Sequence, residues 1–196
     1  MKHKLLLILS MVLFAGGCYA QTPGKEVYND MFKWRIKIPN EFVNMTAEEY
    51  AANQKKGADA LEQTVNSKIE NHSKPIFVFK SDQLHYLESN YQPYDVKTDG
   101  DYSASCRIVN EAVYDTFKKQ MNGAQIDSVY TSETIDGLTF KVFKISINFP
   151  NKMVLTCYMF SRLFTNRDFS VMLMYADKVK GEAMLNAFRK STFGKK

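Results

Sequence analysis

Four extended segments follow one another in the C-terminal half of the chain, separated only by short turns. Asp136-Gly137, between the first two, is a strong signal for a tight hairpin turn. Because strands joined by such short turns run in opposite directions, the sequence predicts a largely antiparallel sheet. The four predicted strands cover residues 126–134, 138–148, 152–164 and 168–176.

The N-terminal half supplies a strand and a helix with well-marked ends. Residues 32–39 read FKWRIKIP, in which apolar and basic residues alternate until the proline. This period of two is typical of a half-buried strand. A helix is predicted over Ala47–Val65, because Thr46 and Glu49 have the spacing of a capping box. Gly57 falls inside this helix, where glycine costs about 1 kcal/mol relative to alanine.

The middle of the chain is predicted to add two strands, a connection and a second helix. Pro75–Lys80 is a mostly apolar run, typical of a strand covered on both faces. Residues 81–101 indicate a long, partly extended connection, and Tyr102–Val109 a strand. Helices over residues 111–123 and after Asp177 complete the order. These elements predict an α+β fold, a three-layer α/β/α sandwich around a largely antiparallel sheet of six to seven strands.

The N-terminus has the layout of a secretory signal peptide. Two lysines in the first four residues precede the apolar run Leu5–Phe14, and small residues follow. This run is too short to span a bilayer, which requires about 20 apolar residues. We therefore predict a signal peptide at residues 1–20, a leader at residues 21–31 and a single domain at residues 32–196, with no transmembrane segment.

Composition argues against nucleic acid as a partner. Removal of residues 1–20 takes away two lysines and no acid, which lowers the formal charge from +5 to +3. Nucleic-acid binding usually shows as a concentrated basic patch, and export makes it less favourable still.

The sequence around Cys18 offers two starting points for the mature chain. Cleavage after Ala20 places Ala20 and Cys18 one and three residues before the cut, and both are small. The alternative is a lipid on Cys18, for which Gly16 and Gly17 fit but Ala15 stands where leucine is expected. We favour cleavage after Ala20 and export to the periplasm or the extracellular space, with a lipid anchor through Cys18 as the alternative.

The sequence contains no motif that points to catalysis or to a cofactor. A nucleotide-binding loop, a nucleophile elbow and a zinc-protease motif are all absent. His72 and His85 lie in separate polar segments, whereas a metal site normally gathers three or four ligands. We therefore expect a protein that is not an enzyme and that uses neither metal nor cofactor.

Two cysteines, Cys106 and Cys157, remain in a chain that begins at Gln21. Each is predicted to lie on a strand face with apolar neighbours, which favours inert buried thiols. The alternative is a disulfide between the two strands, which an oxidising compartment permits and which adds about 4 kcal/mol by loop entropy. The sequence leaves both interpretations open.

Two groups of residues are candidates for binding. Lys33, Arg35 and Lys37 form a basic row. One interpretation is a surface that binds anionic lipid or a partner protein. The other is a solvated strand face that discourages aggregation. The segment HYLESNYQPYDV concentrates three tyrosines near a proline. These are either exposed interface anchors or residues packed over the sheet; they are Tyr86, Tyr91 and Tyr94.

A likeness to a known superfamily is carried by the segments FKWRIKIP, SASCRIVNEAVYDTFKKQM, ETIDGLTFKVFKISI, FSVMLMYAD and the closing STF. Through these segments the chain resembles the superfamily that contains the photosystem II protein PsbP and the Ran-binding Mog protein. The resemblance implies the sandwich fold and a mostly non-enzymatic role in docking onto protein complexes or in lipid-related binding. The resemblance assigns no metal-binding or Ran-contacting residue to a particular position here, so these activities do not carry over.

These observations favour a non-catalytic module of the bacterial envelope that docks onto another envelope protein. The alternative is a carrier that binds a lipid or another small apolar molecule between the sheet and one helix layer. Methionines suit such an adaptable pocket; the candidates are Met153, Met159, Met172 and Met174.

Overall fold

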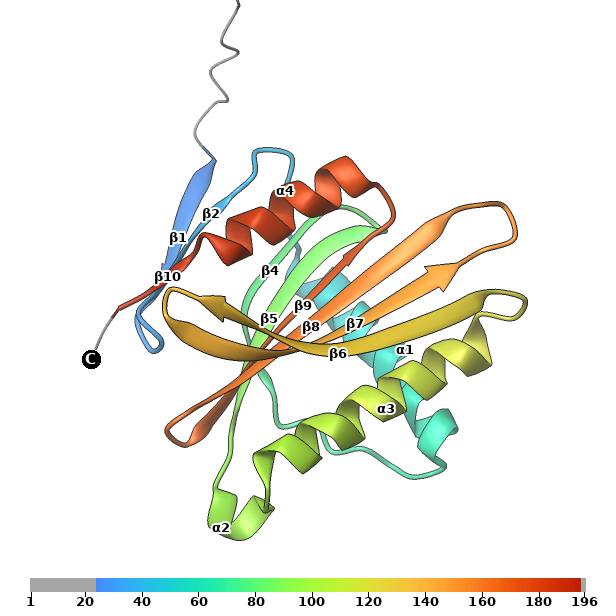
Figure 1. Ribbon diagram of the computed structural model, residues 1–196, viewed down its shortest axis with the longest axis horizontal. Coiled ribbons are helices and arrows are strands. Elements are labelled where there is room, and N and C mark those ends of the chain that lie inside the picture. Colours follow the sequence, from blue (N-terminus) through green and yellow to red (C-terminus); the bar gives the residue numbers. More distant parts are fainter. Residues whose placement is uncertain (1–23, 195–196) are drawn as a thin grey trace, which may run out of the picture.

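The computed structural model describes residues 24–194 of the chain (Figure 1). The predicted signal peptide, the cleavage site after Ala20 and the alternative lipid attachment at Cys18 lie outside these residues. No helix in the described part is long and apolar enough to cross a membrane.

Strands dominate the described residues, and helices are inserted at four places. The elements are β1 Lys25–Asn29, β2 Trp34–Ile38, β3 Val43–Asn44, α1 Ala47–Val65, β4 Lys74–Asp82, β5 His85–Pro93, α2 Val96–Asp99, α3 Tyr102–Gln120, β6 Gln125–Ile135, β7 Leu138–Asn148, β8 Val154–Phe164, β9 Arg167–Tyr175, α4 Lys178–Arg189 and β10 Thr192–Phe193.

Seven of the strands form one antiparallel sheet in the order β3-β4-β5-β9-β8-β7-β6. The predicted hairpin at Asp136-Gly137 is confirmed, because Ile135 pairs with Leu138. Both turn residues have positive φ, 49° and 75°, as the tight hairpin turn requires. A second, three-stranded sheet has the order β1-β2-β10.

The elements stack in layers, which confirms the predicted α+β sandwich. Figure 1 shows α4 on one side of the seven-stranded sheet and α1 and α3 on the other. The small sheet lies on the same side as α4, because apolar side chains of β2 share a core with α4 and the large sheet. The predicted half-buried strand is confirmed as β2, whose residues are alternately buried and exposed.

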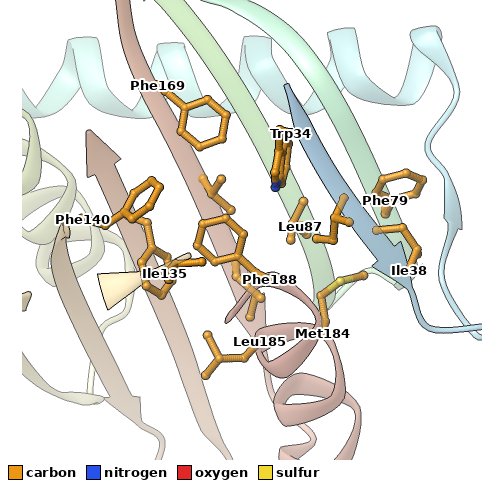
Figure 2. Close-up of a cluster of buried hydrophobic side chains, with 14 of the residues drawn as sticks. Trp34, Ile38, Phe79, Leu87, Ile135, Phe140, Phe169, Met184, Leu185 and Phe188 are labelled. Atoms are coloured by element: carbon orange, nitrogen blue, oxygen red, sulfur yellow. The ribbon is translucent and has the colours of Figure 1, made fainter. Parts of the chain in front are cut away.

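The core beneath α4 is built around Trp34 (Figure 2). Its side chain is fully buried and contacts the rings of Phe77, Phe169, Phe188 and Phe193, with centroids 5.2–6.1 Å apart. The four rings come from β4, β9, α4 and β10. One tryptophan therefore joins both sheets to the C-terminal helix.

The opposite face of the sheet is less completely covered. Its buried apolar residues come from β7 and β8, and α3 packs against them with apolar side chains from its second half. Helix α1 has the predicted bounds and the predicted capping box, yet none of its 19 residues is fully buried. This helix therefore covers the sheet mainly through half-buried contacts.

Three predictions for the middle and the start of the chain are wrong. Residues 102–109 belong to helix α3 rather than to a strand, and Ile108 points into solvent with 68% of its surface exposed. The presumed connection at residues 81–101 contains β5 and the short α2. The presumed leader at residues 21–31 contains β1, which pairs with β2 along its whole length and so belongs to the domain.

Candidate functional site

Two neighbouring acids partly balance the basic row, in which Lys33 precedes β2 and the other two residues lie on it. Lys33 Nζ lies 2.6 Å from a carboxylate oxygen of Asp30, and Arg35 Nη1 lies 2.6 Å from one of Glu26. Lys37 is exposed and stands opposite Glu26 in the register of β1 and β2. The row therefore produces little net positive field, and its role in binding stays a prediction.

The three candidate tyrosines do not form one surface. Tyr86 faces the α1 and α3 layer, and its hydroxyl lies 3.9 Å from the sulfur of Met172. Tyr91 is half-buried on the opposite face, against the ring of Phe32. Tyr94 is buried, and its hydroxyl donates to the carbonyl of Gly100. The structure thus favours the packed alternative, and a role in binding stays a prediction.

Both cysteines are free thiols in the structure. Cys106 is half-buried on α3, whereas the strand expected for it does not form. Cys157 is buried on β8. Burial raises the pKa of both thiols, that of Cys157 to about 12. A thiol with such a pKa is a poor nucleophile, and the disulfide alternative is not formed here.

We expect both thiols to resist alkylation in the folded protein. At pH 8 a thiol with a pKa of about 12 is ionised in only about one molecule in ten thousand, and burial hinders the reagent as well. Iodoacetamide followed by intact-mass measurement checks this. In urea a chain that begins at Gln21 should take up two labels, whereas rapid labelling of the native protein would contradict the prediction.

A buried carboxylate lies between α1 and β5. Glu88 is 6% exposed, and its Oε1 accepts hydrogen bonds from Asn90 at 2.6 Å, Gln54 at 2.8 Å and Tyr50 at 3.3 Å. Burial raises the pKa of Glu88, although these hydrogen bonds oppose the shift. Tyr50 and Gln54 thus attach α1 to the sheet through polar contacts.

A second acid, which is half-buried, occupies the same face of the sheet. Asp168 on β9 accepts a hydrogen bond from the hydroxyl of Tyr102 at 2.7 Å and another from the amide of Gln92 at 3.1 Å. Burial raises the pKa of this carboxyl, and the two hydrogen bonds partly offset the effect. Sequence reasoning missed Glu88 because the period-two pattern of β5 is mostly polar on this face, and it missed Asp168 because its partners lie far away in the sequence.

We expect Glu88→Gln to become more stable relative to wild type as pH rises from 4 to 7. The raised pKa means that the folded state favours the protonated carboxyl of Glu88. In the wild type this preference stabilises the fold below the unfolded-state pKa, and the stabilisation is lost as pH rises through the folded-state pKa. Glutamine keeps an acceptor for the three donors. Urea unfolding at pH 4, 5, 6 and 7 measures the difference.

Glu41→Gln, at an exposed acid, controls for the loss of a charge. The Glu88 prediction is wrong if Glu88→Gln and wild type keep a constant difference in unfolding free energy across this pH range.

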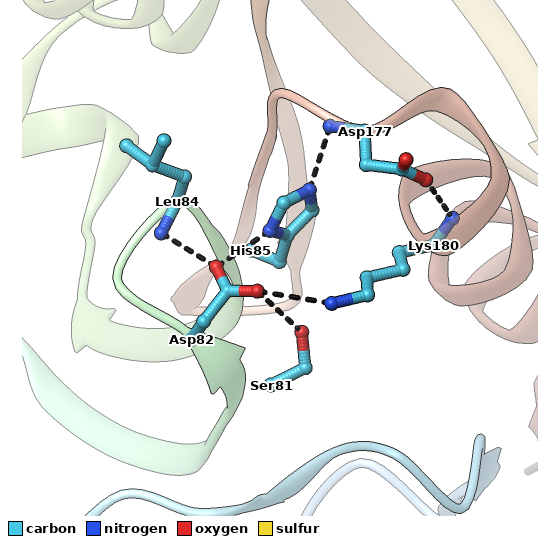
Figure 3. A network of polar contacts seen from close by, with 6 residues as sticks. All are labelled: Ser81, Asp82, Leu84, His85, Asp177 and Lys180. Atoms are coloured by element: carbon cyan, nitrogen blue, oxygen red, sulfur yellow. Dashed lines mark hydrogen bonds and ion pairs between the residues drawn. The ribbon is translucent and has the colours of Figure 1, made fainter.

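An Asp–His pair links the β4–β5 turn to the start of α4 (Figure 3). His85 is 6% exposed; its Nδ1 lies 2.6 Å from Asp82, and its Nε2 accepts the backbone N–H of Asp177 at 2.6 Å. Nδ1 therefore carries the proton in the neutral ring. Burial raises the pKa of Asp82, but hydrogen bonds from His85, Leu84 and Lys180 outweigh this and hold it well below its ordinary value.

This arrangement suits a structural clamp better than acid–base catalysis. Both ring nitrogens of His85 are occupied within the protein, so neither is free to accept a proton from a substrate. Among residues 24–194, no three His, Cys, Asp or Glu side chains are grouped to hold a metal ion.

The most open feature of the large sheet is strand β6, which forms one of its edges. It pairs with β7 over 11 consecutive residues without a bulge. Its residues Asp127–Ser132, named here the β6 strip, are all exposed. The ring of Tyr130 lies on that of Phe143 with centroids 4.4 Å apart, and the guanidinium of Arg107 lies 5.5 Å from its centre.

Comparison with known sequences identifies no family. No protein-family model matches the chain, and no curated protein sequence matches it. Several solved structures, in contrast, are similar to it. The solution structure of cyanobacterial PsbP (CyanoP) from Synechocystis aligns with 93% of this chain and 99% of its own, with a TM-score of 0.54 and 9% sequence identity.

Two further structures align less well. A Bacteroides thetaiotaomicron protein aligns over 89% of this chain and 50% of its own, with a TM-score of 0.45 and 8% identity. The Ran-binding protein Mog1p of Saccharomyces cerevisiae aligns over 86% and 94%, with a TM-score of 0.41 and 10% identity. Since the likeness to cyanobacterial PsbP extends over nearly the whole of both chains, the protein has the PsbP-like fold that its sequence predicts.

Proposed function

We propose that the protein is an exported, non-catalytic module that docks onto a protein partner at the bacterial envelope. The β6 strip carries this proposal. It presents six consecutive exposed residues at a sheet edge, including Val129 and Tyr130, which are 58% and 47% exposed. Exposed aromatic and aliphatic side chains next to unpaired backbone are typical of a surface that another protein covers.

The state of the reactive side chains supports a role without catalysis. Both nitrogens of His85 are engaged within the protein, and the pKa values of Cys106 and Cys157 are raised. The buried Glu88 and the half-buried Asp168 accept hydrogen bonds from neighbouring side chains. Export is supported by the basic start and apolar run of the N-terminal sequence.

Site-specific photo-crosslinking in intact cells tests the docking role. A benzoylphenylalanine is placed singly at four exposed positions far apart in the sequence, and the adducts are identified by mass spectrometry. We expect one discrete protein adduct, formed from some positions and not from others, whose purified partner then binds the purified protein. The absence of an adduct from all positions would contradict docking. The positions are Val43, Ile108, Val129 and Val179.

A carrier of small apolar molecules is the second candidate, supported by the methionines beneath the helices. Met159, Met172 and Met174 lie together on the sheet face that α3 covers, whereas Met153 precedes β8. The incomplete burial of α1 would ease entry to this face. Native mass spectrometry of protein purified from its own envelope should show a bound small molecule, and an empty chain would count against the carrier.

A further inference from the structure

Strand β6 differs from the other sheet edges in the described residues. The opposite edge of the large sheet consists of β3, with two residues, and of the part of β4 that β3 does not cover, which contains Lys74 and Pro75. The small sheet ends in β1, with five residues, and β10, with two. An edge strand directs the N–H and C=O groups of every second residue away from its partner. With 11 residues, β6 therefore offers the longest row of backbone groups for another strand.

Between Ser128 and Ser132 the edge also lacks the devices that usually prevent strand addition. Such edges are commonly interrupted by lysine, proline or a bulge. The sequence of β6, QIDSVYTSETI, contains none of these residues, and its pairing with β7 is unbroken. Residues 128–132 are uncharged, and valine, tyrosine and threonine are good strand formers.

Charge distinguishes one end of the β6 strip from the other. Asp127 is exposed, and its carboxylate has no hydrogen bond or ion pair within residues 24–194. At the far end, Glu133 is held by two hydrogen bonds of 2.8 Å from Arg189. A strand added along the strip would therefore gain most from a basic residue opposite Asp127, since opposite charges on facing residues stabilise a pair.

A second copy of β6 fits this edge less well. An antiparallel copy centred on Tyr130 places Asp127 opposite Glu133 at both ends, where like charges repel. Moving the copy by one step in either direction along the same face places Asp127 opposite Thr131 or Ile135, which leaves it without a cation. A segment of a different protein that carries lysine or arginine fits the edge better, because it can place a cation opposite Asp127.

We propose that the β6 strip binds an extended, largely uncharged segment of the partner protein as an added antiparallel strand, with a lysine or arginine opposite Asp127. This inference rests on the proposed docking function and specifies its mode. The added strand places β-branched residues beside Ser128, Tyr130 and Ser132 on the face of the sheet that α3 covers. On the other side it faces Val129 and Thr131.

A defined peptide probes this mode. The nine-residue peptide TVTVTVKVT, paired antiparallel with residues 125–133, places valine opposite Tyr130 and its lysine opposite Asp127. A matched peptide carries glutamate in place of the lysine. Binding is followed by NMR titration of the labelled protein, together with exchange of the β6 amides. We expect the lysine peptide to bind about three- to fivefold more tightly and to protect alternate amides of β6.

Three protein variants separate specific strand addition from general stickiness. Asp127→Asn should abolish the preference for the lysine peptide, because it removes only the charge. Thr131→Lys should weaken both peptides about tenfold, since lysine blocks strand edges. Val179→Lys, at an 81% exposed residue of α4, is the matched control and should bind as wild type does.

The outcomes distinguish this inference from the docking function. Strand addition is overturned if the β6 amides gain no protection, or if Thr131→Lys and Val179→Lys bind the peptides equally. It is also overturned if the free protein is a dimer with protected β6 amides, because a second copy is then the occupant. A cellular adduct at other positions together with no peptide binding at β6 would leave docking standing and strand addition wrong.

Discussion

Replacing Trp34 with alanine is expected to lower the free energy of unfolding by about 3–5 kcal/mol. The side chain is completely buried, and aromatic rings from four other elements surround it. Its removal leaves a cavity between the two sheets and α4 that these rings fill only in part. Because Trp34 also joins the small sheet to the rest of the core, we expect the loss near the upper end of this range.

Two milder variants separate packing from hydrogen bonding at this position. Trp34 Nε1 donates to Ser191 Oγ at 3.0 Å. Ser191→Ala leaves that buried donor without a partner and should cost about 1–3 kcal/mol, whereas Trp34→Phe keeps an aromatic ring and should cost less than alanine. Circular dichroism in urea is the suitable measurement, because Trp34 is the chain's only tryptophan. A loss below about 1 kcal/mol for Trp34→Ala would contradict the packing argument.

Elements governed by local rules could be predicted from the sequence. Helix α1 has the predicted bounds, because the capping box of Thr46 and Glu49 sets its start through contacts three residues apart. Strand β2 was predictable because its buried face is fully apolar and its exposed face fully basic. The tight turn at Asp136-Gly137 followed from the same short-range chemistry.

Predictions that depended on an ambiguous pattern were wrong. In residues 102–109 small or apolar residues alternate with polar ones, which suggests a strand. The segment is nevertheless helical, and Asp101 caps this helix by accepting a hydrogen bond from the N–H of Ala104. The alternation was therefore accidental: Ile108, which a strand would place on the same face as Cys106, is exposed. Strand β5 was missed for the opposite reason, because buried polar residues such as Glu88 and Ser89 hide its period of two.

The β6 strip could not be identified as a candidate surface without knowing the order of the strands in the sheet. The sequence predicted a strand at residues 126–134, but whether it lies inside the sheet or at its edge depends on pairings between distant segments. The same holds for Asp168, whose partners Tyr102 and Gln92 are 66 and 76 residues away. Such neighbours leave no periodic signal in the chain.

Gly181→Ala is expected to destabilise the fold by about 1–3 kcal/mol, although alanine is the better helix former. Helix α4 crosses directly over Tyr175, and a Cβ added at Gly181 would lie 2.0 Å from Cγ of that ring. The helix or the ring must therefore move. Either shift disturbs the core formed by Met184, Leu185 and Phe188 on the same helix.

Gly57→Ala is the matched control, because nothing lies within 4 Å of a Cβ added at this position of α1. There the change should stabilise the protein by about 1 kcal/mol, through helix propensity alone. Urea unfolding of both variants, together with Tyr175→Ala alone and combined with Gly181→Ala, measures the coupling between ring and glycine. If the steric argument holds, Gly181→Ala costs less once the ring is gone; an equal cost in both backgrounds would show that α4 does not depend on this close approach.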